Sequence, residues 1–167
     1  MKPQSQRRAR GLSAVDFVQR LGTRFPDVVL VVGDGLSSVA VERNAVPVLE
    51  PLCKQLADLG LRSAPIIVAS QARVALADEI GELLQAKLSV ILIGERPGLS
   101  AADSLGMYLT FEPRRGRVDS ERNCISNIHA AGMRAEDAAA RAVDLIRSML
   151  KHRAAGVLLA ARIARQS

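Results

Sequence analysis

Short apolar runs alternate with amphipathic stretches along most of the chain. Residues 28–32 form a run of valines and leucine that ends at a Gly-Asp-Gly turn, as a buried strand does. Residues 41–59 then repeat apolar side chains at spacings of three and four, which predicts a helix that Pro47 kinks or splits and that Gly60 ends. The chain therefore begins with a strand followed by a helix.

The same two patterns recur downstream. They predict further strands at residues 64–70, 88–94, 107–111 and 124–128, and further helices at residues 76–84 and 135–150. Strands that lack polar alternation and are separated by helices are typical of parallel sheets covered on both faces. The predicted fold is α/β: a Rossmann-like, mostly parallel sheet with helices on both faces and right-handed crossover connections.

The helix predicted at residues 76–84 carries its charges off its apolar stripe. Asp78 and Glu79 both lie outside that stripe. Charged side chains are rarely buried unless they are paired, so we expect both carboxylates to face solvent.

Basic residues are concentrated at the two ends of the chain. Four precede residue 11 and four follow residue 150, and neither end carries an acidic residue. Because the formal net charge of the whole chain is only +6, the stretch between is slightly acidic, and a basic nucleic-acid-binding face is not expected. We divide the chain into a basic N-terminal arm (1–26), one folded domain (27–150) and a basic C-terminal tail (151–167).

Several common kinds of site are not indicated. Two cysteines, Cys53 and Cys124, are too few for a disulfide framework or a zinc site, so no metal ligands are predicted. The two histidines fall in a loop and in the basic tail, and no Gly-x-Ser-x-Gly elbow supplies a nucleophile. Neither a membrane-spanning run nor a secretory signal is evident, so we expect a protein of a reducing, cytoplasmic compartment.

The segment GDGLSS (33–38) follows the first predicted strand. Two glycines between a strand and a helix allow a phosphate to approach the helix N-terminus. The dinucleotide-binding fingerprint requires a third glycine where Ser38 stands, so a structural turn is the favoured interpretation. Asp34 and Ser37 then serve either as helix caps or as ligand contacts.

The segment NIHAAG (127–132) approaches the Asp-x-His-x-x-Gly motif, in which a histidine ligates the cobalt of a cobalamin. Asn127 stands where an aspartate would fix the tautomer of that histidine. The segment also comes late in the chain, whereas domains with this motif carry it after their first strand. We interpret His129 as a loop residue.

The strand predicted at residues 88–94 runs directly into Glu95 and Arg96. Open α/β sheets bind their ligands at the carboxyl ends of strands. The alternatives for the charged pair are therefore a ligand site and a surface ion pair of little energetic weight. Cys124, taken alone, indicates only a small buried residue at a strand end.

Three stretches of the chain resemble one protein family closely. They are ARVALADEIGELL (72–84), VILIGERPGLSAADSLGMYLTFEP (90–113) and RNCISNI (122–128), and VVGDGLSS is similar to a turn near the start of the family's domain. In their amino-acid sequence and their order along the chain they resemble the small (light) subunit of ethanolamine ammonia-lyase, over about residues 27–156.

The resemblance implies an adenosylcobalamin-dependent carbon–nitrogen lyase that converts ethanolamine to acetaldehyde and ammonia. In this family a large TIM-barrel subunit holds the substrate, and the Rossmann-like small subunit covers the cofactor at the subunit interface. The two subunits assemble in equal numbers, bind cobalamin base-on and often work within a bacterial microcompartment. The resemblance also implies that the small subunit alone is inactive.

By motif, the implied cofactor contacts are Val74 of ARVA, Glu95 of IGERPG and Cys124 of RNCISN, and none of them is catalytic. Val74 would supply apolar contact, and Cys124 would pack against the corrin or its nucleotide tail. Glu95 would accept hydrogen bonds from the cofactor while Arg96 balances its charge. The family carries a longer N-terminal region than residues 1–26 provide, and LLAARIARQS fits it poorly, so contacts from those regions are not carried over.

Two other classes of function stay open at this point. One is a stand-alone cobalamin- or nucleotide-binding module, which would bind cobalamin tightly without a lyase partner. The other is a scaffold that docks through its basic arms, for which Glu95 would be dispensable.

Overall fold

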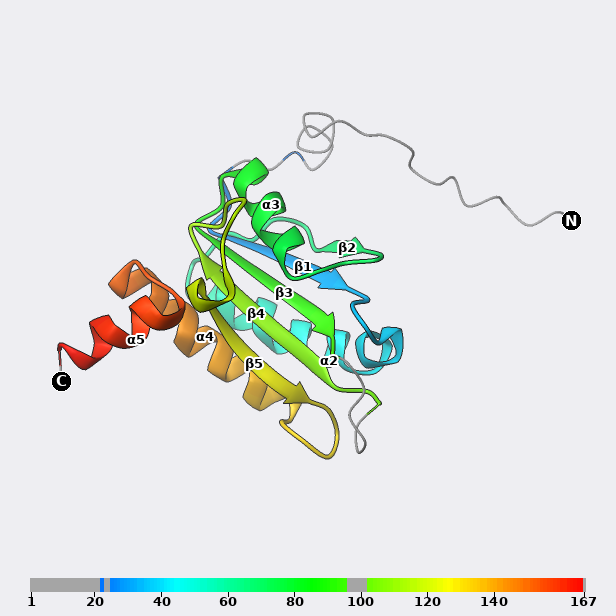
Figure 1. Cartoon of the computed structure of the whole chain (residues 1–167). Coiled ribbons are helices and arrows are strands. Elements are labelled where there is room, and N and C mark those ends of the chain that lie inside the picture. The colour runs from blue at the N-terminus through cyan, green and yellow to red at the C-terminus, as the bar shows by residue number, and fades with distance from the viewer. Residues whose placement is uncertain (1–21, 23–24, 96–101, 167) are drawn as a thin grey trace, which may run out of the picture.

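The computed structural model describes residue 22, residues 25–95 and residues 102–166. That part of the chain forms five strands, four α-helices and one 3-10 turn (Figure 1). In chain order they are β1 (Val28–Gly33), α2 (Ser38–Asp58), β2 (Ile67–Ala69), α3 (Ala75–Leu84), β3 (Leu88–Gly94), β4 (Leu105–Phe111), η1 (Asp119–Glu121), β5 (Arg122–Ile128), α4 (Ala135–His152) and α5 (Gly156–Ala164). Arg96 and most of the predicted N-terminal arm lie outside the described residues.

The five strands form one mixed sheet in the order β2-β1-β3-β4-β5. β1 pairs in parallel with β2 and β3, whereas β4 runs antiparallel to both β3 and β5. The α/β class is confirmed, but the mostly parallel, Rossmann-like sheet is wrong. A parallel neighbour needs a crossover of a dozen or more residues, usually a helix, and the described chain has no α-helix between β3 and β4 or between β4 and β5.

Helices cover both faces of the sheet, as predicted, but they do so unequally (Figure 1). α2 and α4 pack together on one face, where they form the larger apolar cluster with residues from β1, β3, β4 and β5. α3 packs on the other face against β1 and β3. Among the described residues this second cluster contains nothing from β5, and Tyr108 of β4 joins it only half-buried. On the α3 side the sheet is therefore open around Tyr108 of β4 and Cys124 of β5 in the single chain, whereas the start of β5 is covered at the buried Arg122.

The first long helix is uninterrupted. α2 continues through Pro47 and Pro51, so the predicted kink does not split it. Ser37 caps its N-terminus by accepting a hydrogen bond from the Ala40 amide at 3.2 Å. Gly60 follows the last turn with φ +70°, as the sequence predicts for a helix end.

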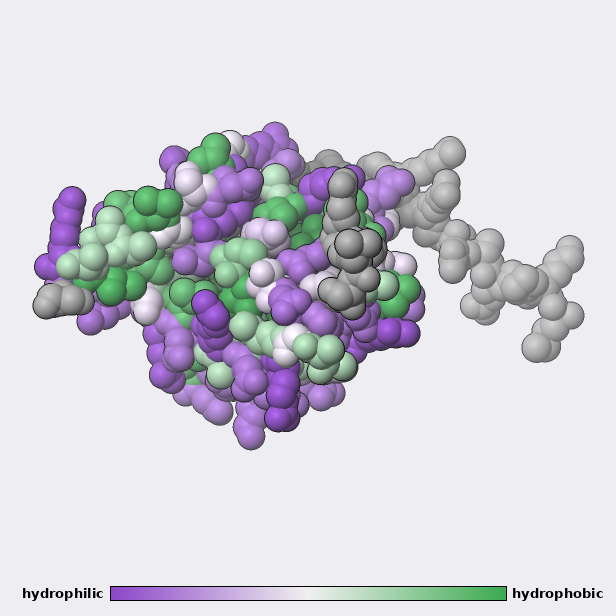
Figure 2. Space-filling model, turned by 60° about the horizontal axis from the view of Figure 1, so that its bottom comes forward, coloured by the Kyte–Doolittle hydropathy of each residue, from purple (hydrophilic) through white to green (hydrophobic). Residues whose placement is uncertain are grey.

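The segment predicted as a basic C-terminal tail holds the end of α4 and all of α5. Leu159 of α5 is buried, whereas Val157, Leu158 and Ile163 are exposed. Apolar side chains accordingly gather at the α5 end of the face shown in Figure 2. None of the described helices is both long and apolar enough to cross a membrane.

Asp78 of α3 is buried, contrary to the expectation that it faces solvent. Arg122 donates to the Oδ2 atom of Asp78 from Nε at 3.2 Å and from Nη2 at 2.5 Å. The Asp78 side chain is only 3% exposed and the Arg122 side chain 5%. Glu79 does face solvent, where it lies 3.4 Å from Arg115. A buried carboxylate is tolerated here because a guanidinium from β5 is paired with it.

Candidate functional site

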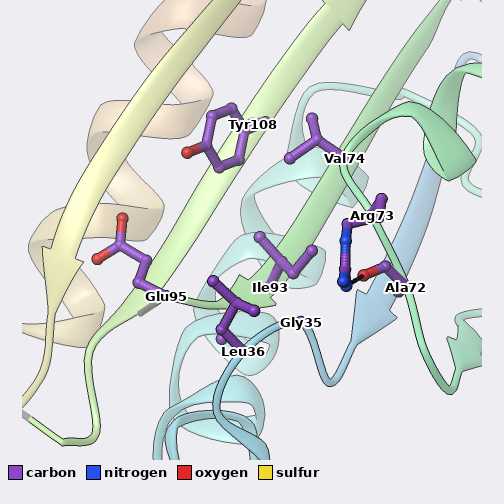
Figure 3. Close-up of a pocket in the computed structure, with 9 residues that line it drawn as sticks. Gly35, Leu36, Ala72, Arg73, Val74, Ile93, Glu95 and Tyr108 are labelled. Atoms are coloured by element: carbon purple, nitrogen blue, oxygen red, sulfur yellow. Dashed lines mark hydrogen bonds between the residues drawn. The ribbon is translucent and has the colours of Figure 1, made fainter. Parts of the chain in front are cut away.

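A pocket of about 350 Å³ lies at the carboxyl ends of β1 and β3. Its walls come from the turns after β1 and β2, the end of β3 and the middle of β4, through Gly35, Leu36, Ala72, Arg73, Val74, Ile93, Gly94, Glu95 and Tyr108. Ile93 and Leu36 lie at its centre, with Glu95 on one side and Arg73 on the other (Figure 3). The pocket thus combines an apolar floor with opposite charges at two edges.

The structure brings two of the three proposed cofactor contacts together. Val74 and Glu95 both line the pocket, although 21 positions separate them in the sequence. Cys124 does not line it; this exposed residue lies opposite Tyr108 in the β4–β5 register, one strand further along the open face. It is therefore not the small buried residue that its sequence position suggested. Whether these three residues contact a cofactor stays a prediction.

One oxygen of the Glu95 carboxylate is held by the protein. Ser104 Oγ donates to Oε2 at 2.5 Å, and the Asn127 amide donates to the same atom at 3.3 Å. The Glu95 backbone amide also donates to the Ser104 carbonyl at 2.9 Å. Within the described part of the chain Oε1 accepts no such bond, so it remains available to a ligand that donates.

A glycine makes room for this carboxylate. Gly106 of β4 lies where a Cβ atom would approach Glu95 Oε1 to 2.7 Å. The β4–β5 register also shifts between Leu105 and Met107, which places the glycine at an irregularity of the sheet. The local backbone therefore shapes a cradle for the Glu95 side chain.

Asp34 ties together the two turns that form the pocket wall. Its carboxylate accepts hydrogen bonds from the Gln71 amide at 2.8 Å and the Ala72 amide at 3.0 Å. These two bonds lower the pKa of Asp34 below its usual range. The Leu36 amide donates to the Gly94 carbonyl at 2.9 Å, so amides of this turn serve the fold, in agreement with the structural interpretation of GDGLSS.

Removing the Asp34 charge is expected to weaken the pocket wall in a pH-dependent way. A carboxylate whose pKa is lowered in the folded state stabilises that state above its unfolded pKa and loses the contribution as the pH falls. Asp34→Asn should therefore unfold more easily than the wild type at neutral pH, and the difference should shrink below about pH 4. Urea titrations of both proteins from pH 7 to pH 3 measure this, and a difference that grows on acidification would contradict it.

Tyr108 is a pocket residue that the sequence reasoning missed. It is half-buried in β4, where it lies between Ile91 and Cys124 in the strand registers. Burial, followed by the neighbouring Cys124 and Glu95, raises the pKa of Tyr108 to about 12. Desolvation by its neighbours likewise raises the pKa of Cys124, although the nearby tyrosine hydroxyl opposes that shift. The phenol and the thiol are therefore both neutral at physiological pH.

His129 lies in the turn after β5, as predicted. Its Nε2 atom is 2.7 Å from Asn127 Oδ1. The same asparagine has φ +63° and donates its backbone amide to Glu95. The NIHAAG segment therefore contacts the Glu95 side of the pocket through the Asn127 amide.

The pocket fits one edge of a corrinoid but not a whole one. A cavity of about 350 Å³ is at the lower end of the range for drug-sized ligands, and a corrin with its nucleotide tail is much larger. The donor set is suitable, because corrin side chains are mainly carboxamides, whose N–H groups can bond to the free Glu95 oxygen.

The class of protein that the structure defines is an α/β domain with a mixed five-stranded sheet and an open pocket at the carboxyl ends of β1 and β3. A family model described as "Ethanolamine ammonia-lyase light chain (EutC)" matches residues 2–160. The chain therefore belongs to this family.

Individual relatives agree with that assignment. The chain is 51% identical over 144 residues to the ethanolamine ammonia-lyase small subunit of Rhodopseudomonas palustris. The matched stretch covers 86% of this chain and 55% of the relative. It is 52% identical over 133 residues to the protein of the same name from Azotobacter vinelandii, over 80% of this chain and 49% of the relative. The chain thus spans about half the length of the relatives that it matches.

Proposed function

We propose that this chain is the small subunit of an adenosylcobalamin-dependent ethanolamine ammonia-lyase and forms one wall of the cobalamin site. The observation that carries the proposal is the meeting of Val74 and Glu95 in one open pocket, with Cys124 beside it on the uncovered part of the sheet. Family membership, which the light-chain model supports over residues 2–160, gives the ligand its chemical class.

The role of this chain is to hold and shield the cofactor. Glu95 is proposed to accept a hydrogen bond from a corrin carboxamide through its free oxygen. Val74 and Ile93 offer apolar surface that excludes water from the corrin edge. When bound, adenosylcobalamin would supply the homolysis of its cobalt–carbon bond, while this subunit positions the cofactor and excludes water from one side of it.

The partner is proposed to be the large, TIM-barrel subunit, in a hetero-oligomer with equal numbers of both chains. The size of the pocket supports such a partner, since this surface alone covers only part of a corrinoid. We place the complex in the cytoplasm, with a bacterial microcompartment as the second location to examine.

Reconstitution tests this function directly. The chain is co-expressed with the large subunit from one of its relatives' organisms, and ammonia release from ethanolamine is measured with adenosylcobalamin present. We expect no turnover from this chain alone, little from the large subunit alone, and cobalamin-dependent turnover from the purified complex. Failure of a soluble, co-purifying complex to bind cobalamin would overturn the proposal.

Binding measurements on this chain alone and on the complex separate the rival functions. Tight cobalamin binding by this chain without any partner indicates a stand-alone binding module. Association that depends on the basic ends of the chain but is unchanged by Glu95→Gln indicates a scaffold. His129→Ala serves as a control, since a loop histidine that does not ligate cobalt should leave cobalamin base-on in electron paramagnetic resonance spectra.

A further inference from the structure

Tyr108 occupies a position between the pocket and the open part of the sheet. It lines the pocket with Val74 and Glu95, and its strand partner on the other side is the exposed Cys124. Figure 3 shows its hydroxyl directed away from Val74, on the side of β4 that faces β5. No helix of the described chain covers it on that side, because α3 packs over β1 and β3.

The hydroxyl is a hydrogen-bond donor with a poor acceptor. Its pKa of about 12 keeps the phenol protonated at neutral pH, so the group donates and does not repel Glu95. Among the described residues, the group paired with this hydroxyl is the Cys124 thiol, and sulfur accepts hydrogen bonds weakly. A half-buried phenol in such surroundings gains a stronger bond when a ligand brings a carbonyl oxygen to it.

We propose that Tyr108 is a further cofactor-contacting residue, whose hydroxyl donates a hydrogen bond to the oxygen of a corrin carboxamide. The inference rests on the proposed function, because it takes cobalamin as the ligand of this pocket. It adds a donor to a site for which the sequence motifs supply an acceptor, Glu95, and two packing contacts, Val74 and Cys124.

Glu95 selects the amide form of the ligand, and Tyr108 adds a donor for the oxygen of the same group. A primary carboxamide presents both an N–H donor and an oxygen acceptor, which match the free oxygen of Glu95 and the hydroxyl of Tyr108. A carboxylate at the same position has no donor and carries a charge of the same sign as Glu95. Fully amidated cobalamin should therefore bind more tightly than the derivative in which the contacted amide is hydrolysed to an acid.

The test uses the purified complex with the large subunit and measures the Kd of cyanocobalamin by equilibrium dialysis. Removing a hydrogen bond from a partly buried donor typically corresponds to a roughly 3- to 10-fold change in equilibrium constant, so Tyr108→Phe should weaken binding by about that factor. Thr110→Val is the matched control, because it removes a hydroxyl from the same strand two residues away and outside the pocket. Its Kd should equal that of the wild type.

The set of cobalamin monocarboxylic acids identifies the contacted amide. One member should bind the wild-type complex much more weakly than cyanocobalamin, and Glu95→Gln should reduce that discrimination because it removes the like charge. Tyr108→Phe should not reduce it, because a phenol donates to a carboxylate oxygen at least as well as to an amide oxygen. Melting curves of the complexes without cofactor separate a structural role: a hydroxyl needed only for Cys124 would shift the melting temperature of Tyr108→Phe and leave the Kd unchanged, which would overturn the inference. If the wild-type complex itself binds no cobalamin, the proposed function fails instead.

Discussion

Arg122→Met is expected to lower the free energy of unfolding by about 3–5 kcal/mol, the usual cost of removing one partner from a buried ion pair. The substitution keeps much of the side-chain volume but leaves the Asp78 carboxylate buried without its guanidinium. Ser89 Oγ, 3.4 Å from Asp78 Oδ1, is too distant to replace it. Urea unfolding of the chain, followed by circular dichroism, measures the loss.

Asp78→Ala should cost less than Arg122→Met. In that variant Arg122 keeps its hydrogen bonds to Asp119 Oδ1 and to the Arg117 carbonyl, both at 2.8 Å. The double variant Arg122→Met/Asp78→Leu should recover much of the stability, because it removes both charges and leaves apolar groups in their place. Equal losses in the single and the double variants would contradict this account.

A surface ion pair between α3 and the segment after β4 provides the control. Glu79 and Arg115 lie 3.4 Å apart, but their side chains are 46% and 71% exposed. Arg115→Met should change stability by only about 0–1 kcal/mol, as is usual for solvent-exposed pairs. The contrast between the two arginines tests burial rather than charge.

The buried pair also connects the segments that carry the candidate site. Asp78 belongs to the helix that begins directly after Val74, and Arg122 precedes Cys124 by two positions on the same face of β5. A variant that breaks the pair therefore loosens α3 from β5. Such a variant is expected to disturb cobalamin binding as well, so it cannot serve as a test of cofactor contact.

Strands and helices could be predicted because their signals are local. Residues 88–94 form a run that is apolar except for Ser89, and they match β3 residue for residue. Strand direction is not local, since it depends on what lies between the strands. The links before β4 and β5 are each about ten residues long and carry no helical pattern. This favours antiparallel pairing, because a parallel neighbour needs a crossover of a dozen or more residues.

Burial of polar residues could not be predicted from one helix alone. The periodicity of α3 places Asp78 off the stripe that packs on β1 and β3, but β5 supplies Arg122 from 44 positions further along. Tyr108 was missed for a similar reason, since a tyrosine in an apolar strand looks like core until the neighbouring strand proves to be uncovered. Only the tertiary arrangement of β4 and β5 reveals both.

Glu95→Gln is expected to weaken the binding of cobalamin to the assembled complex by roughly 5- to 150-fold, which corresponds to about 1–3 kcal/mol for a donor left unpaired at a dry interface. Glutamine keeps one oxygen to accept from Ser104 Oγ and the Asn127 amide, so the local structure is preserved. Its amide nitrogen then takes the place of the free oxygen, and it donates where the ligand also donates. Glu95→Ala should lose the same affinity and some stability too, because Ser104 loses its acceptor.

Gly106→Ala offers an independent way to move the Glu95 carboxylate without changing its chemistry. The added methyl group would lie 2.7 Å from Glu95 Oε1, and the nearest atoms all belong to that flexible side chain, so the carboxylate must shift while the sheet is kept. We expect a weaker affinity for cobalamin than in the wild type, with a smaller loss than Glu95→Gln produces and with little change in melting temperature. Equilibrium dialysis with cyanocobalamin and a melting curve of each complex provide both readouts. If Glu95→Gln and Gly106→Ala lower the melting temperature but bind cobalamin as tightly as the wild type, then Glu95 serves the fold, and the cofactor contacts this surface elsewhere.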